Sequence, residues 1–277
     1  MPVLDEDFMS KPLLISFSGG LTSGLMTAML CDYFADREKA IVFANTGLED
    51  EETLIFVNEC DKRWNLGVVW VEALINPEFG KGTRHTIVDF ASAHRKGEPF
   101  EAVIAKYGIT NKAFPHCTRE LKKYTIQSYI KNDLGWTDYQ TAIGIRADER
   151  NREKDEYYPL IEWGIDLSVV QRFWANQSFT LNLKPYEGNC KFCWKKSDKK
   201  LVRLAMEQPE GLDWYKAMEK KYSTMQAPHR QKLLEPNYFF RGKKSAMDLL
   251  ELAEIAKQQH SLFETLDETE TDCYCKS

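Results

Sequence analysis

Paired glycines in the stretch FSGGLTSGLM, residues 17–26, restrict the possible folds of this chain more than any other feature. They follow the apolar run Leu13–Ile15, which is typical of a buried strand, and they precede a helical pattern that runs to Phe34. The glycines let the backbone approach phosphate oxygens closely, Ser18 and Ser23 add hydroxyl groups, and a helix N-terminus adds positive potential. We therefore expect a phosphate-binding loop, although a glycine turn that only packs a strand on a helix would share this pattern.

Strands and helices alternate along the first half of the chain. The patterns predict strands over residues 13–17, 40–44, 68–71 and 139–145, and helices over residues 23–34, 52–64 and 118–133. Residues 76–111 indicate an excursion from the sheet with two helices, broken near residues 97–99. Such alternation is typical of βαβ units, so we predict an α/β fold with a parallel sheet. We divide the chain into an α/β domain, residues 1–195, and a mainly helical C-terminal region, residues 196–277, that ends in an acidic, mobile tail.

Composition indicates a globular protein of the cytoplasm. Of the 277 residues, 43% are hydrophobic and 29% are charged, and no run approaches the ~18 apolar residues that a membrane helix needs. The first residues lack the basic and apolar regions of a secretory signal, so we expect a cytoplasmic protein without a membrane partner. The formal net charge of −5 gives no global attraction for nucleic acid, so such a contact would need a local basic patch. One run of basic residues is either such a patch or a solvated helix face: Lys195, Lys196, Lys199, Lys200 and Arg203.

The cysteines point to thiols or metal ligands rather than to disulfides. They are seven in number and unevenly spread: Cys31, Cys60, Cys117, Cys190, Cys193, Cys273 and Cys275. The Cys-x-x-Cys pair of Cys190 and Cys193, together with the remote Cys117, supplies three sulfurs of a tetrahedral site. Three hypotheses remain open: a structural zinc with His116 as fourth ligand, a [4Fe-4S] cluster held by the three cysteines, and no metal.

The glycine loop lacks the lysine of a Walker A motif and the glycine spacing of a dinucleotide-binding fingerprint. It resembles instead the PP-loop, S-G-G-x-D-S, of the N-type ATP pyrophosphatases and the phosphoadenylyl-sulfate (PAPS) reductases. The resemblance implies a Rossmann-like (HUP-type) parallel sheet with helices on both faces. It makes the following residues contacts of an adenine nucleotide such as ATP: Ser16, Ser18, Gly19, Gly20, Thr22 and Ser23. Ser18 also becomes a candidate catalytic residue. Thr22 stands where the family commonly has Asp, so a role for Mg²⁺ stays open.

A second segment of this resemblance ends the strand predicted over residues 40–44. The tripeptide of Asn45, Thr46 and Gly47 is similar to a D-T-G turn that lies beside the adenosine in PAPS reductase-like proteins. The match makes these three residues candidates for nucleotide contact, whereas alone they would be an ordinary turn.

A third segment, GIRADERNR over residues 144–152, looks like the family's G-x-R-x-x-E-S-x-x-R, with Arg where Ser is usual at position 150. The match implies that Arg146 and Arg152 bind phosphate and that Arg146 is a candidate catalytic residue. Asp148 and Glu149 become candidate metal ligands or orienting groups. Without the match, a solvated loop is the simpler interpretation.

The cysteines match the family only in part. Assimilatory adenylyl-sulfate reductases, which these motifs resemble, hold a [4Fe-4S] cluster with a C-C pair before R-K and a distant C-x-x-C. Here His116 and Cys117 take the place of that pair, so one ligand is replaced or absent. A similar three-cysteine pattern occurs in DNA phosphorothioation ATP pyrophosphatases and tRNA thiolases. The resemblance implies a cluster held by the cysteines and a redox role for Cys273. It also implies that Arg119 and Lys122 bind the substrate anion, and it makes Arg119 a candidate catalytic residue.

Three functional hypotheses follow from the resemblance. In the first, ATP is attacked at its α-phosphate by an acceptor oxygen, pyrophosphate leaves, and the adenylated acceptor receives sulfur at the cluster. In the second, PAPS or adenylyl sulfate is reduced to sulfite. In the third, the chain is a non-catalytic nucleotide- and cluster-binding subunit of a nucleic-acid-modifying complex. The partners implied are an adenine nucleotide, a sulfur-donor or reductant protein, a nucleic-acid substrate or complex subunits, and a second copy in a homo-oligomer.

Overall fold

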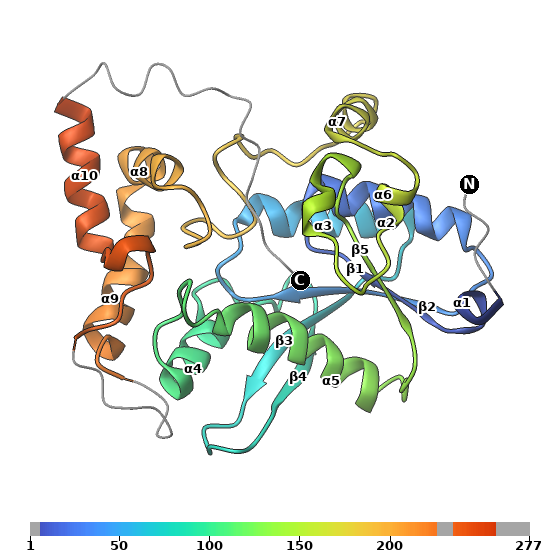
Figure 1. Cartoon of the computed structure of the whole chain (residues 1–277), viewed down its shortest axis with the longest axis horizontal. Coiled ribbons are helices and arrows are strands. Elements are labelled where there is room, and N and C mark those ends of the chain that lie inside the picture. The colour runs from blue at the N-terminus through green and yellow to red at the C-terminus, as the bar shows by residue number, and fades with distance from the viewer. Residues whose placement is uncertain (1–5, 226–234, 259–277) are drawn as a thin grey trace.

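A single five-stranded sheet organises the computed structural model, which describes residues 6–225 and 235–258 (Figure 1). The strands are β1 (Leu13–Ser16), β2 (Lys39–Asn45), β3 (Val69–Ile75), β4 (Thr83–Val88) and β5 (Gln140–Ile143), in the order β4-β3-β2-β1-β5. All pairings are parallel except that of β3 with β4. The chain builds the sheet outward from β1 through β2 and β3, and then returns to place β5 on the other side of β1. The predicted α/β class and parallel sheet are therefore confirmed.

Helices cover both faces of the sheet, as Figure 1 shows. On one face lie α2 (Leu21–Tyr33), α3 (Glu51–Trp64), α6 (Pro159–Glu162) and α7 (Leu167–Ala175). On the other lie α4 (Glu98–Tyr107) and one continuous helical segment, in which the π-helix η1 (Cys117–Tyr124) leads into α5 (Thr125–Asn132). Because side chains alternate along a strand, Leu13 and Ile15 of β1 enter the core under α2, whereas Leu14 packs toward α5.

A helical layer closes one end of the sheet (Figure 1). Its elements are α8 (Asp198–Glu207), η3 (Pro209–Leu212), α9 (Asp213–Tyr222), η4 (Arg241–Lys243) and α10 (Ala246–Gln258). The remaining short helices are α1 (Glu6–Ser10) and η2 (Ala147–Arg152). The prediction of a mainly helical C-terminal region is confirmed for the described residues. Within those residues no helix is both long and apolar enough to cross a membrane.

One sequence prediction is wrong. Of the two helices expected within residues 76–111, only the second exists, as α4. The first is replaced by β4, which pairs antiparallel with β3 from Thr83 opposite Ile75 to Val88 opposite Trp70. Thr83 and His85 face the η1–α5 helical segment, where they hydrogen-bond to Glu120 and Ser128. β-Branched residues and the glycines before them favour a returning strand, and this tertiary contact fixes it.

Candidate functional site

The sheet has a topological switch point between β1 and β5, because the strands after β1 are added first on one side of it, as β2 and β3, and then on the other side, as β5. Open α/β sheets bind ligands in the crevice at the carboxyl ends of such strands. A cavity of about 300 Å³ lies at this place, and we call it the switch-point pocket. Ser16, Ser18 and Gly144 come from the ends of β1 and β5. The remainder is lined largely by apolar and hydroxyl side chains, among them Leu14, Ile126, Tyr139, Thr141, Ile143, Ile145 and Tyr158.

The glycine loop joins β1 to α2 in a conformation that requires glycine. Gly19 has a φ of +83°, and a Cβ there would lie 2.6 Å from the Cγ2 atom of Thr53. Gly20 is the N-cap of α2. The loop therefore presents the N-terminus of a 13-residue helix beside the switch-point pocket, as the sequence predicts.

The loop hydroxyls are hydrogen-bonded to each other and to the loop backbone. Ser18 Oγ donates to Ser23 Oγ at 2.9 Å, and Ser23 Oγ donates to the Gly20 carbonyl at 3.0 Å. Ser16 and Ser18 line the switch-point pocket, whereas Ser23 is buried in the first turn of α2. Thr22 lies in the same turn and is partly exposed. The loop is thus held in shape before any ligand binds.

The two arginines predicted as anion ligands are both paired with carboxylates of their own segment. Arg146 contacts Asp148 at 2.9 Å and Glu149 at 3.4 Å, and Arg152 contacts Glu149 at 2.6 Å. The hydrogen bond from Arg146 lowers the pKa of Asp148. Arg152 lines the switch-point pocket, but Arg146 is buried behind it. Of the two, Arg152 is therefore the one in position to meet a ligand.

The side chains of the predicted turn at residues 45–47 lie in two different surroundings. Asn45 is fully buried, and its amide donates to Glu72 at 2.6 Å and to the His94 carbonyl at 2.8 Å. Thr46 donates to Glu49 at 2.8 Å and lines a pocket with the cysteines. Gly47, at φ +82°, makes the turn possible. Asn45 thus braces the turn from inside the sheet, and Thr46 is the member that reaches a cavity.

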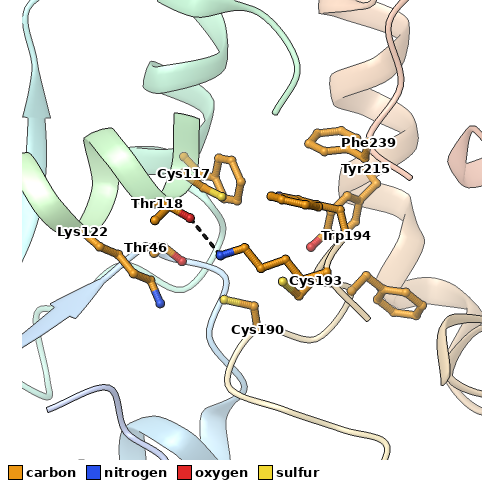
Figure 2. A pocket seen from close by; sticks show the side chains of 12 residues that line it. Thr46, Cys117, Thr118, Lys122, Cys190, Cys193, Trp194, Tyr215 and Phe239 are labelled. Atoms are coloured by element: carbon orange, nitrogen blue, oxygen red, sulfur yellow. Dashed lines mark hydrogen bonds between the residues drawn. The ribbon is translucent and has the colours of Figure 1, made fainter. Parts of the chain in front are cut away.

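Three cysteines from two separate segments line one pocket, which we call the cysteine pocket (Figure 2). Cys117 comes from η1, and Cys190 and Cys193 come from the turn before α8. Burial raises the pKa of Tyr215 well above its ordinary value, and the three neighbouring thiols raise it further. The Sγ atom of Cys190 lies 3.5 Å from a carboxylate oxygen of Glu49. The fold therefore brings together thiols that are far apart in the sequence.

The donor set of the cysteine pocket fits a sulfur-ligated metal. Three thiols suit either a [4Fe-4S] cluster or zinc. Among residues 6–225 and 235–258, however, no three Cys, His, Asp or Glu side chains are arranged as ligands of one ion. The cavity measures about 30 Å³, which is room for one or two waters. The residues for a metal are thus present, but the structure shows no ligand geometry.

His116 does not join the cysteines. Its buried ring stacks on Phe114 and Tyr107, with ring centroids 6.1 and 5.4 Å away, and its Nδ1 atom lies 3.3 Å from an Arg119 nitrogen. His116 is not part of the lining of the cysteine pocket, and the zinc hypothesis that used it as fourth ligand stays a prediction. Arg119 pairs with Glu120 at 2.6 Å. This predicted catalytic residue is not part of the lining of the cysteine pocket.

Contacts that the sequence did not predict hold the two pockets side by side. Asn189 donates to the Ser18 carbonyl through its side chain, and its own carbonyl accepts from the Asp50 amide at 2.6 Å. The cysteine turn is therefore fixed against the glycine loop. Thr118 lines both pockets. The only sequence signal for the contact between Asn189 and Ser18 was the position of Asn189 directly before the Cys-x-x-Cys pair.

Two lysines lie at the cysteine pocket, one within the cysteine turn and one in η1. Lys196 is fully buried, and its ammonium donates to the carbonyls of Cys190 and Lys191. Lys122, predicted as an anion ligand, lines the cysteine pocket. Cys273, the predicted redox cysteine, lies outside the described residues.

Comparison with known proteins relates the chain to one family. The family model of the phosphoadenosine phosphosulfate reductase domain matches residues 12–163. An uncharacterized nin region protein of Escherichia phage lambda is 35% identical over 208 residues, which is 72% of this chain and 71% of that protein. An uncharacterized protein of Methanocaldococcus jannaschii is 25% identical over 139 residues, covering 50% of this chain and 24% of that protein. The matched domain contains the sheet, the glycine loop and Cys117, and it ends before Cys190 and Cys193.

Proposed function

Because the chain belongs to the phosphoadenosine phosphosulfate reductase domain family, we propose that it binds ATP and activates an acceptor for sulfur transfer. The observation that carries this proposal is the shared wall of the two pockets. A cavity at the switch point, beside a glycine loop, adjoins a cavity lined by three thiols, and Thr118 belongs to both. A nucleotide in the first cavity would thus react within reach of sulfur chemistry in the second.

The activation step is a displacement at the α-phosphorus of ATP. An acceptor oxygen forms a bond to this phosphorus, the bond to the bridging oxygen breaks, pyrophosphate leaves, and the acceptor hydroxyl gives up its proton to solvent. The amides at the start of α2 and the hydroxyl of Ser18 would stabilise the charge on the phosphates. One helix N-terminus contributes only about 0.3–1 kcal/mol at an exposed position, so the loop amides, Ser18 and Arg152 must act together.

A sulfur nucleophile from a donor protein would then displace AMP from the adenylated acceptor, forming the acceptor–sulfur bond as the acceptor–oxygen bond breaks. Cys117, Cys190 and Cys193 would hold a [4Fe-4S] cluster, which when bound supplies electrons or an iron position open to sulfur. A reducing compartment such as the cytoplasm would keep these thiols available as metal ligands.

Pyrophosphate release and cluster content test the proposal. We expect ATP-dependent pyrophosphate release by anaerobically purified protein, a brown chromophore with about four irons per chain, and loss of pyrophosphate release in Ser18→Ala. Ser10→Ala, at an exposed position of α1, is the control that should retain activity. Stoichiometric zinc in place of iron, or equal activity in Ser18→Ala and Ser10→Ala, would contradict it.

A second candidate function is reduction of PAPS or adenylyl sulfate to sulfite, which the description of the matching family favours. It predicts sulfite release that depends on thioredoxin and needs no ATP. A third, a non-catalytic nucleotide-binding subunit, is favoured by Thr22, which offers no carboxylate for Mg²⁺. It predicts tight nucleotide binding without turnover.

A further inference from the structure

A third cavity of about 550 Å³ opens next to the two pockets, and its lining carries more positive charge than theirs. Its lining includes four cationic side chains and, within the described part of the chain, no Asp or Glu. They are Lys112, Arg152, Lys195 and Arg241, and we call this cavity the basic mouth. A concave surface lined by one sign of charge concentrates ligands of the opposite sign.

Most of this positive charge is not neutralised by neighbours. Arg152 pairs with Glu149, but among residues 6–225 and 235–258 no carboxylate forms an ion pair with Lys112, Lys195 or Arg241. Lys195 Nζ donates instead to the Thr118 hydroxyl at 3.0 Å. The Arg241 guanidinium donates to the Lys195 carbonyl at 2.7 Å. Hydrogen bonds to uncharged partners fix the wall and leave its charges available to an anion.

The basic mouth adjoins both pockets of the candidate site. It shares Thr118 and Arg152 with the switch-point pocket, and Thr118, Trp194 and Lys195 with the cysteine pocket. A ligand seated in the mouth would therefore touch residues that also line the switch-point pocket and the cysteine pocket. Its volume lies within the range of small-molecule sites, about 300–1,000 Å³.

We propose that the basic mouth binds the second substrate, the acceptor, through a phosphate ester that the acceptor carries. This inference rests on the proposed function, since it identifies the chemical class of the molecule that is activated. A phosphate ester fits because lysine and arginine side chains at a concave surface match phosphate oxygens. Its source is either one nucleotide of a single-stranded nucleic acid or a free nucleotide. The formal net charge of −5 over the whole chain argues against general adhesion of polyanions.

Fluorescence anisotropy of a short labelled single-stranded RNA, with unlabelled uridine monophosphate as competitor, tests the proposal on the full chain. We expect Lys112→Ala and Arg241→Ala each to weaken RNA binding about threefold or more, with a salt dependence reduced by roughly one released ion per charge removed. Arg241→Lys, which keeps the charge, should bind nearly as wild type. Lys62→Ala, at an exposed position of α3 outside the mouth, is the matched control.

The arms separate the outcomes. If RNA binds far more tightly than uridine monophosphate, the source of the phosphate ester is a nucleic acid. If the two bind equally, the source is a free nucleotide. Either result supports the proposed role of the basic mouth. If neither probe binds, or if Lys62→Ala weakens binding as much as the mouth variants, the inference is overturned. It is overturned as well if the Lys112→Ala/Arg241→Ala double variant weakens ATP binding, because the mouth would then hold the triphosphate. ATP binding measured by calorimetry keeps the two proposals apart: its absence in wild type refutes the proposed function, whatever the anisotropy shows.

Discussion

At the scale of single residues, one glycine allows the end of β5 to lie close to the first turn of α2. Gly144 directly follows β5, and a Cβ there would lie 3.0 Å from the Cα atom of Ser23 and 3.3 Å from its nitrogen. This contact is with backbone, which cannot move aside as a flexible side chain can. The absence of a side chain at Gly144 therefore lets the end of β5 rest against the first turn of α2.

Gly144→Ala should accordingly displace the glycine loop. We expect a loss of about 1–2 kcal/mol in the free energy of unfolding from overpacking. We also expect ATP affinity to fall about tenfold, which corresponds to about 1.4 kcal/mol. Urea denaturation and calorimetry measure the two effects. Gly82→Ala is the matched control, since a Cβ there would meet no atom within 4 Å. Equal ATP affinity in both variants would contradict the role assigned to Gly144.

Lys196 offers a second test at this scale. Replacing it by Met keeps its bulk but leaves the carbonyls of Cys190 and Lys191 without this donor. We expect a loss of about 1–3 kcal/mol in the free energy of unfolding and a lower iron content after anaerobic purification. Lys191→Met, at an exposed position of the same turn, should change neither. Unchanged stability in Lys196→Met would show that the turn does not depend on this ammonium.

At the scale of elements, most strands follow their own sequence and one follows its neighbours. β1, β2, β3 and β5 all lie where periodicity predicts them. β4 does not, because the stretch TRHTIV has one face against α5 and an exposed face, and a short amphipathic stretch fits either a strand or a helix. Pairing with β3 and the hydrogen bond between His85 and Ser128 make this stretch a strand.

The junction between α9 and α10 carries a pH dependence. Glu219 of α9 accepts hydrogen bonds from the backbone amides of Phe239 and Ala246, and burial raises its pKa from about 4.5 to about 7. The folded state therefore holds a proton that the unfolded state has lost between these values. The contribution of Glu219 to stability is complete below about pH 4.5 and is lost as the pH rises through about 7.

We expect the free energy of unfolding to fall between about pH 5 and pH 8 by on the order of 2–3 kcal/mol through this group. Glu219→Gln should remove most of this slope, because the amide does not titrate, while costing about 1 kcal/mol at acid pH for one amide left without an acceptor. Urea denaturation at both pH values measures it, with Glu210→Gln, at an exposed position of η3, as the control. A slope that Glu219→Gln leaves unchanged would refute this origin.

At the scale of the whole molecule, one core joins the sheet to the helical layer. The largest buried cluster combines Phe100 and Val103 of α4 with Phe192 before α8, Tyr215 of α9 and Leu249 of α10. Phe192 and Tyr215 pack edge to face with ring centroids 6.0 Å apart. The boundary predicted between residues 195 and 196 therefore passes through a continuous core.

We expect the intact chain to unfold in a single thermal transition, and a chain ended at residue 195 to fail to fold cooperatively. Such a chain would expose Phe100, Val103 and Ile104, which are at most 6% exposed in the intact protein. Scanning calorimetry and size-exclusion chromatography measure this. A soluble monomer of residues 1–195 with its own sharp transition would instead establish two independent domains.

The sequence by itself determined the α/β class, four strands of the sheet and the place of the glycine loop between β1 and α2. These depend on residue periodicity and on glycine conformation, which act over a few neighbouring residues. It also suggested the three cysteines, because a Cys-x-x-Cys pair is a local pattern. Only the tertiary structure decided which side chains line a pocket. It placed His116 in an aromatic cluster and paired Arg146 with Asp148, since these contacts depend on elements that meet only in the folded chain. For the same reason no local pattern revealed that Thr118 lines all three cavities.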